Sequence, residues 1–274
     1  MARCVILIVD GLRPDAVRPD VAPSLHALGE DYTHADGALT VRPSVTVAAL
    51  LSLTTGVGPA THQLVEPGLS AVRKLGNLHP LPRELSARQL PTVVVAGEIR
   101  AIEVPVARLL ASVAGVGRFV ATAGPARRVA AAALGRLRFV KDGLVIVYVN
   151  DCDRAGHTHG WMSDRYLEAV READAAVGAL RACAADSLLA VVADHGGGGV
   201  HPTDHDLPHP VNDGIPLILA GPRVRRRHVL RGTTSLLDLP PTVLWALGLD
   251  VPADYEGRVL HEAFVAAEPV SAVA

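Results

Sequence analysis

Residues 4–10 read CVILIVD, an unbroken run of aliphatic residues that ends at the carboxylate of Asp10. The same arrangement recurs at 144–153 (LVIVYVNDCD) and at 188–194 (LLAVVAD). Short runs that are apolar throughout are typical of strands buried on both faces of a parallel sheet. Because the carboxyl ends of parallel strands meet at one edge of a sheet, three acidic side chains should converge there. These are Asp10, Asp153 and Asp194.

The rest of the chain alternates between apolar runs and Ala/Leu-rich stretches. Strands are predicted at Cys4–Val9, Thr92–Ala96, Leu144–Val149, Leu188–Val192 and Pro216–Leu219. Helices are predicted at Pro23–Leu28, Thr46–Leu53, Ala126–Leu137, Asp164–Cys183 and Leu236–Leu247. The pattern predicts an α/β fold with a mostly parallel central sheet and helices on both faces. We expect a single domain over residues 1–265, followed by a frayed tail at 266–274.

Composition excludes several classes of protein. The net charge of −2 argues against a nucleic-acid or anionic-membrane binder, and the basic run Arg223–His228 is too short to reverse this. No apolar run is long enough to cross a bilayer, and the start predicts a strand instead of a signal peptide. The three cysteines have no motif spacing, which indicates reduced thiols and a cytoplasmic protein. They are Cys4, Cys152 and Cys183.

Carboxylates and imidazoles gather near the predicted strand ends. Asp153 and His157 are four residues apart, and Gly156 between them would permit a sharp turn. In an extended chain Asp194 and His195 would point in opposite directions, so they need not serve the same ion in the same way. A loop with further histidines follows, at His201, His205 and His209. A lone histidine is usually an ordinary surface or core residue, but the whole set indicates divalent metal ions.

Thr46 is the candidate nucleophile, because it directly precedes the helical run 47–53. A threonine at a helix N-terminus is usually an ordinary cap. The same position suits catalysis, since the first N–H groups and the helix dipole favour a bound phosphate. An adjacent metal ion would activate the hydroxyl further, and two ions could clamp a phosphoryl group.

Five segments together resemble the type I phosphodiesterase/nucleotide pyrophosphatase branch of the alkaline phosphatase superfamily. They span almost the whole chain in the family's order, and the last is a structural tail signature without ligands. The segments are ILIVDGLRPD (6–15), TVRPSVTVAALLSLTTGVGPATH (40–62), DRAGHTHG (153–160), ADHGGGG (193–199) and LLDLPPTVLWALGLDVPADYEGRVL (236–260).

The resemblance implies an alkaline-phosphatase-like fold and a site with two divalent ions, most simply zinc. One ion would be held by Asp153, His157 and a later histidine, for which His205 fits best and His209 and His201 are alternatives. The other ion would be held by Asp10, Thr46, Asp194 and His195. The nucleophile of the family lies nine residues before the threonine of a Thr-Gly pair, which is Thr55-Gly56 here and places the nucleophile at Thr46.

The implied reaction is hydrolysis of a phosphate ester through a threonyl-phosphate. Many relatives carry an asparagine three residues after the nucleophile, where this chain has Ala49. This departure slightly favours a phosphomonoester over a phosphodiester, and Arg42, Arg154 or His209 could contact the substrate instead. A phosphodiesterase or nucleotide pyrophosphatase, a phosphonate hydrolase, and a non-catalytic metal- or ligand-binding relative remain alternatives. We expect a small phosphorylated substrate, no nucleic acid and no membrane; the oligomeric state is left open.

Overall fold

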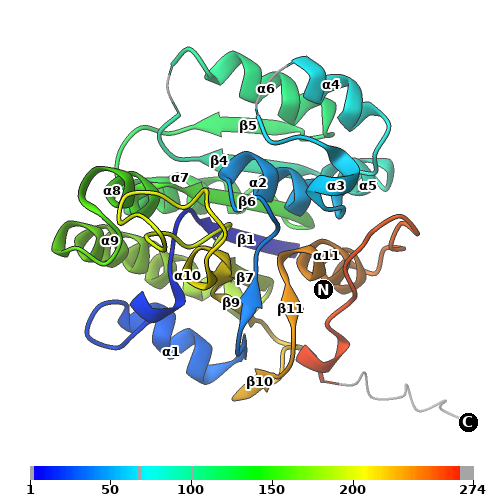
Figure 1. The fold of residues 1–274 in the computed structure, drawn as a ribbon. Coiled ribbons are helices and arrows are strands. Elements are labelled where there is room, and N and C mark those ends of the chain that lie inside the picture. The colour runs from blue at the N-terminus through cyan, green and yellow to red at the C-terminus, as the bar shows by residue number, and fades with distance from the viewer. Residues whose placement is uncertain (1–2, 67–68, 100, 266–274) are drawn as a thin grey trace, which may run out of the picture.

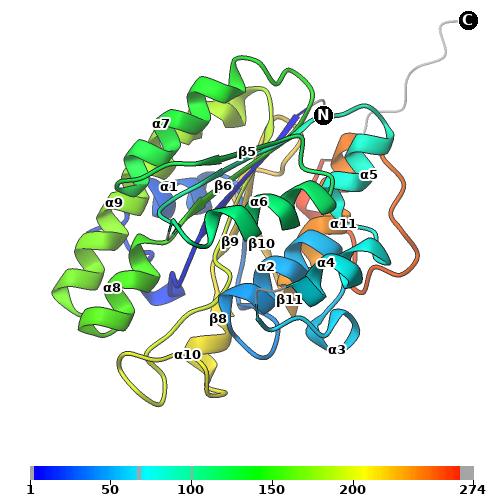
Figure 2. The ribbon, with the colours of Figure 1, turned by 90° about the horizontal axis from the view of Figure 1, so that it is seen from above.

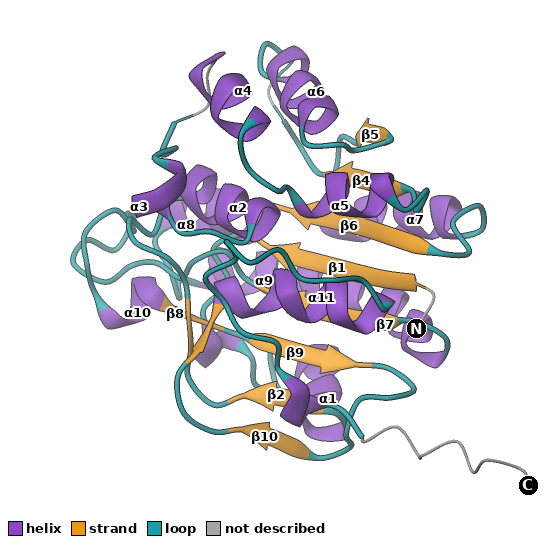
Figure 3. Ribbon diagram, turned by 90° about the vertical axis from the view of Figure 1, so that its right-hand side faces the viewer, coloured by secondary structure: helices purple, strands orange, loops and turns teal. Residues whose placement is uncertain are grey.

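The computed structural model describes residues 3–66, 69–99 and 101–265 (Figure 1). The predicted tail at 266–274 lies outside these residues. An eight-stranded sheet crosses the molecule, and Figure 3 shows its strands in succession. Their order is β10 (His228–Leu230), β2 (Thr33–Ala35), β9 (Leu217–Ala220), β7 (Leu188–Val192), β1 (Arg3–Val9), β6 (Gly143–Val149), β4 (Thr92–Ala96) and β5 (Arg118–Ala121).

Seven of these eight strands share one direction, and β9 alone runs antiparallel to its neighbours β7 and β2. The predicted fold class is therefore confirmed. The predicted strand Pro216–Leu219 begins one residue later, at Leu217. Its direction could not be predicted, because a strand buried on both faces has the same apolar pattern in either direction.

β1 lies in the middle of the sheet and positions the site. Every residue from Cys4 to Val9 is buried, as expected for a strand covered on both faces. β1 pairs in parallel with β6, where Val9 is opposite Val149, and with β7, where Ile8 is opposite Val192. The three strands therefore end at the same level, and the residues that follow them are brought together.

Helices cover both faces of the sheet, as Figure 2 shows. One face carries α1 (Pro23–Asp31), α7 (Ala126–Leu137) and α9 (Asp164–Leu180). The other carries α2 (Thr46–Thr55), α5 (Leu81–Ala87) and α11 (Leu239–Leu247). The other helices are α3 (Pro59–His62), α4 (Leu69–Gly76), α6 (Val104–Val113), α8 (Asp151–His159) and α10 (Pro210–Asp213). A small second sheet contains β11 (Thr234–Ser235), β3 (Ala38–Leu39) and β8 (Gly214–Ile215).

Two predicted helices are shorter than expected. The segment Arg181–Ala185 after α9 is a 3₁₀ helix, a common way for a helix to end. The segment Leu236–Asp238 before α11 is also 3₁₀. Pro240 and Pro241 follow it, and they lack the N–H groups that would extend the α-helical ladder back to this turn.

Two long-range contacts hold helices in place. The N-cap of α1 is Ala22, which has no side-chain cap, and the buried Asp174 of α9 replaces it. Its carboxylate accepts hydrogen bonds from the backbone N–H groups of Ser24 (3.1 Å) and Leu25 (2.7 Å). At the end of α2, the Tyr255 ring lies so close to Gly56 that a Cβ there would be overlapped by it. The C-terminal segment therefore fixes the helix that begins at Thr46.

Among the described residues, no helix is both long and apolar enough to span a bilayer. One large apolar cluster joins both faces of the sheet, and a small satellite cluster contains Leu64, Ala71 and Leu75. A single domain over 1–265 remains a prediction.

Candidate metal centre and active site

The three carboxylates predicted from the strand ends lie together. Asp10 follows β1, Asp194 follows β7, and Asp153 lies in α8, directly after β6. The backbone N–H of Asp153 donates to the carbonyl of Asp10 (3.0 Å). The N–H of Gly11 donates to Asp194 Oδ1 (3.2 Å). The loops after all three strands are therefore hydrogen-bonded to one another around a single centre.

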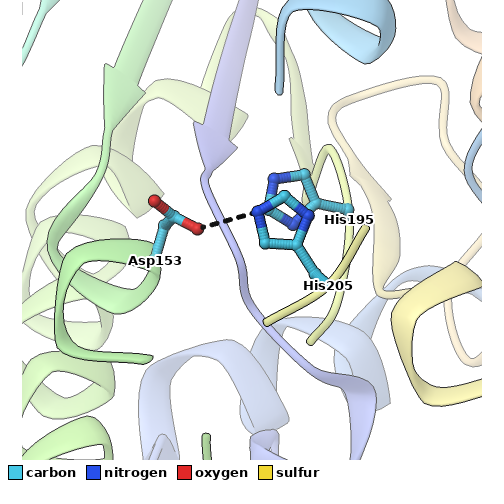
Figure 4. A group of neighbouring side chains, drawn as sticks. All are labelled: Asp153, His195 and His205. Atoms are coloured by element: carbon cyan, nitrogen blue, oxygen red, sulfur yellow. Dashed lines mark ion pairs between the residues drawn. The ribbon is translucent and has the colours of Figure 1, made fainter. Parts of the chain in front are cut away.

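Side chains around this centre form two groups that could each hold a metal ion. One consists of Asp153, His195 and His205, drawn in Figure 4, and the other of Asp10, Asp194 and His195. Within each group the candidate ligand atoms lie within 4.8 Å of one another. His195 Nε2 is 3.3 Å from Asp10 Oδ1 and 3.7 Å from Asp194 Oδ2. His195 belongs to both groups, whereas the resemblance implied that it serves one ion.

Asp194 and His195 belong to one candidate group, and the alternation considered for an extended chain does not apply to them. Strand β7 ends at Val192, and Asp194 lies in a bend. Without extended backbone the side chains need not alternate. Both therefore face the same group of ligands.

The expected sharp turn at Gly156 is also wrong. Residues 151–159 form one continuous helix, α8, in which Asp153 and His157 are four residues apart on the same face. His157 Nε2 is 3.4 Å from Asp153 Oδ1. Gly156 is small for a different reason: a Cβ at this position would be 2.5 Å from the ring of Trp161.

Hydrogen bonds fix the tautomer of each central histidine. Nδ1 of His195 lies 2.8 Å from the Gly196 carbonyl, Nδ1 of His205 lies 2.7 Å from that of Ser44, and Nδ1 of His157 lies 2.9 Å from that of Thr203. A carbonyl can only accept, so each Nδ1 carries the proton and each Nε2 keeps a free lone pair. Metal-binding histidines are typically oriented in this way.

The carboxylates leave three buried oxygens without a hydrogen-bond donor in the described part of the chain. These are Asp10 Oδ1, Asp153 Oδ1 and Asp194 Oδ2. Burial, followed by the charges of Asp194 and Asp153, raises the pKa of Asp10 well above its usual value. Burial likewise raises the pKa of Asp153. Clustered buried carboxylates without donors are costly, and divalent cations would satisfy them. The donor set of carboxylate oxygen and imidazole nitrogen therefore fits metal ions.

Thr46 faces this centre and does not act as a cap. It is the first residue of α2, whose N-cap is Val45 without a side-chain hydrogen bond. Its Oγ1 lies 3.1 Å from Nε2 of His195, the histidine shared by both groups. Ala49, three residues on, is fully buried in the core. No phosphate donor is therefore present at that position.

The three candidate substrate contacts already have partners. Arg42, whose side chain is 61% exposed, pairs with the buried carboxylate of Asp213. Arg154 pairs with Glu98 and lies 3.4 Å from Asp151.

His209 is the N-cap of α10, where its Nδ1 accepts a hydrogen bond from the N–H of Val211 (3.3 Å). It belongs to neither ligand group, and nor does the exposed His201. Of the three histidines in this loop, His205 is the one that belongs to a candidate ligand group of the described residues.

Two residues at the site were not predicted. The Tyr148 hydroxyl in β6 donates to Asp10 Oδ2. Its signal in the sequence was a polar group near the end of an otherwise apolar strand. Trp161 packs beside His157 and His205. No pattern in the sequence pointed to it.

Comparison with known proteins supports these observations. Residues 4–75 and 115–227, about two thirds of the chain, match the family described as type I phosphodiesterase/nucleotide pyrophosphatase. A curated relative is the 2,3-bisphosphoglycerate-independent phosphoglycerate mutase of Rhodopirellula baltica, 34% identical over 140 residues. That alignment covers 46% of this chain and 24% of the mutase. The chain therefore matches about a quarter of the mutase's length.

Solved structures show the same fold at low sequence identity. A phosphonate monoester hydrolase from Silicibacter pomeroyi superposes with a TM-score of 0.74 at 16% identity, covering 99% of this chain and 78% of that one. Human ectonucleotide pyrophosphatase/phosphodiesterase 5 gives a TM-score of 0.75 at 11% identity, covering 97% and 100%. The chain therefore belongs to the type I phosphodiesterase/nucleotide pyrophosphatase family, a family of phosphoester hydrolases, and it has the alkaline phosphatase fold.

Proposed function

We propose that this protein hydrolyses a small phosphate ester, using two divalent metal ions and Thr46 as the nucleophile. The contact that carries this proposal is the 3.1 Å approach of Thr46 Oγ1 to Nε2 of His195, which is shared by both ligand groups. A hydroxyl with no role in capping, next to a candidate metal ligand and at a helix N-terminus, is suited to attack a bound phosphate.

The ligands divide between two ions. Asp153, His157 and His205 would hold one, and Asp10, Asp194, His195 and Thr46 the other. His205 Nε2 lies 3.7 Å from Asp153 Oδ1, and His157 Nε2 approaches the same oxygen. Mixed nitrogen and oxygen ligands favour zinc. When bound, the ions would lower the pKa of the Thr46 hydroxyl and neutralise charge on the phosphoryl oxygens.

Thr46 Oγ1 would attack phosphorus in line as its proton is lost to solvent. The bond to the ester oxygen breaks, this oxygen takes a proton from solvent so that the alcohol leaves, and a threonyl-phosphate remains. The uncapped N–H groups in the first turn of α2 would donate to the phosphate oxygens. A water molecule then attacks from the side that the alcohol left, so that phosphate is released and Thr46 regains its proton. Two inversions give net retention at phosphorus.

We favour a phosphomonoester as substrate. Position 49 lacks a donor, and both Arg42 and Arg154 are held by carboxylates. His157 is 46% exposed at the side chain, so the centre is accessible to a small molecule. The family match supports a phosphodiesterase or nucleotide pyrophosphatase as the second candidate. The phosphonate hydrolase and the mutase among the similar proteins add phosphonate cleavage and phosphoryl transfer as further possibilities.

The decisive experiment is Thr46→Ala in the metal-reconstituted protein. Metal content should stay near two ions per chain, while turnover falls by roughly 10⁴-fold or more. Thr54→Ala is the matched control, because Thr54 lies on the same helix and its hydroxyl donates to the Leu50 carbonyl (2.7 Å), within the helix itself. Substrates should include nitrophenyl phosphate, bis-nitrophenyl phosphate, nucleotides and phosphonates. Full activity of Thr46→Ala would refute the mechanism, and a metal-free, inactive wild-type protein would favour a non-catalytic relative.

We also propose that residues 1–265 form one catalytic domain. A cytoplasmic location remains a prediction, which the three buried, unpaired cysteines support.

A further inference from the structure

Trp161 contacts two of the predicted metal ligands. Its side chain is buried, and its ring packs edge-to-face against His157, with centroids 5.1 Å apart and planes at 79°. It packs in a similar way against His205, at 5.7 Å and 73°. These two histidines come from α8 and from the loop after β7, segments that the indole therefore joins.

Glycines surround the indole. A Cβ at Gly156, Gly197 or Gly198 would overlap Trp161 atoms. Gly156 lies between Asp153 and His157, while Gly197 and Gly198 lie two and three residues after His195. The backbones of both ligand-bearing segments therefore approach the ring closely, and its position constrains theirs.

Hydrogen bonds fix the indole in place. Its Nε1–H donates to the carbonyl of Gly11 (2.9 Å), next to Asp10. The backbone N–H of Trp161 donates to the carbonyl of Pro202 (2.8 Å), in the loop that carries His205. The Gly11 carbonyl also accepts from the Tyr166 hydroxyl (2.9 Å), so it keeps a donor if the indole is removed.

From these contacts we infer that Trp161 is a positioning residue that sets the geometry of the ion held by Asp153, His157 and His205, and that its fluorescence reports on that ion. The inference rests on the metal centre proposed above. The ring packs against two imidazoles of this ligand set, whereas it reaches the other set through the hydrogen bond from its Nε1–H to the Gly11 carbonyl, beside Asp10. Loss of the ring should therefore weaken binding of the ion held by Asp153, His157 and His205 much more than binding of the other ion.

The test measures the two dissociation constants of Co²⁺ separately, by chelator competition on the full chain. Trp161→Leu should weaken binding of the ion held by Asp153, His157 and His205 by roughly 10- to 100-fold, as expected for loss of a partner that orients a ligand. The affinity for the other ion should stay near wild type. Trp161→Phe should restore part of the loss, because it keeps an aromatic edge. The chain has a second tryptophan, Trp245, which packs on His261 and Phe264, so Trp245→Phe is the matched control.

Fluorescence gives a second readout that does not depend on how well Trp161→Leu folds. In the Trp245→Phe protein Trp161 is the tryptophan that emits. Co²⁺ should quench this emission in proportion to its occupancy of the site formed by Asp153, His157 and His205. In the Trp161→Phe protein the emission of Trp245 should change little. Equal Co²⁺ constants in Trp161→Leu and wild type, or no quenching of Trp161 by bound Co²⁺, would overturn the inference. A wild-type chain that binds no divalent ion would instead refute the metal centre itself, and this inference with it.

Discussion

Replacing Gly156 with alanine tests whether the indole constrains α8. The added Cβ would lie 2.5 Å from ring atoms of Trp161, against about 3.5–4.0 Å for an ordinary carbon–carbon contact. Either the ring or the helix must therefore shift by roughly 1 Å. Overpacking of this kind costs about 1–3 kcal/mol, whereas alanine in a helix gains about 1 kcal/mol over glycine. The free energy of unfolding should fall by about 0–2 kcal/mol, and metal affinity by about tenfold.

Gly135→Ala is the matched control for this substitution. Gly135 lies in α7, where an added Cβ would have no atom within 4 Å. This variant should gain up to about 1 kcal/mol and bind metal normally. Urea unfolding with excess chelator measures stability, and chelator competition measures metal affinity. If Gly156→Ala is stabilised as much as Gly135→Ala and binds metal normally, the indole does not constrain the helix.

Three further predictions follow from contacts around the site. Tyr148→Phe removes the donor to Asp10 and should weaken metal binding by roughly 10- to 100-fold, with activity recovered in excess metal; no change in affinity would contradict this. Asp174→Ala leaves the N-terminus of α1 uncapped and should lower the free energy of unfolding by about 2–3 kcal/mol, measured by urea unfolding, with turnover of the remaining folded enzyme unchanged. The metal-free protein should lose stability as pH rises above about 4, because the folded state, in which the pKa values of Asp10 and Asp153 are raised, keeps protons that the unfolded chain has already released. Between about pH 4 and 6.5 this trend is opposed by His205, whose pKa burial lowers from 6.5 to about 4, so chemical unfolding with chelator should compare wild type with Asp10→Asn from pH 4 to 8; a stability difference that stays constant over this range would refute the assignment.

Local patterns were sufficient to predict five of the eight strands in the described sheet and the side chains that meet at its edge. The apolar runs ending near Asp10, Asp153 and Asp194 indicated buried parallel strands, and shared strand direction brings their carboxyl ends together. The order of the five segments then identified the family. This reasoning succeeded because buried strands and motif spacing can both be recognised from residues that lie close together in the sequence.

Contacts between distant segments could not be predicted. Arg42 was proposed to bind substrate, but it pairs with Asp213, 171 positions away, and no local pattern records this. Gly156 was interpreted as a turn residue. Glycine occurs both at turns and where segments pack closely, and only the position of Trp161 shows that close packing is the reason here.

The place of β1 in the sheet has a consequence for how the chain folds. The strand is synthesised before both of the strands that cover its edges, which follow about 140 and 185 positions later. Until those segments leave the ribosome, the six apolar residues Cys4–Val9 of β1 have no native partner strand. Pairing between strands so far apart in sequence is slow. The nascent polypeptide must therefore stay shielded from aggregation until β7 has been synthesised, and the metal centre cannot assemble before then.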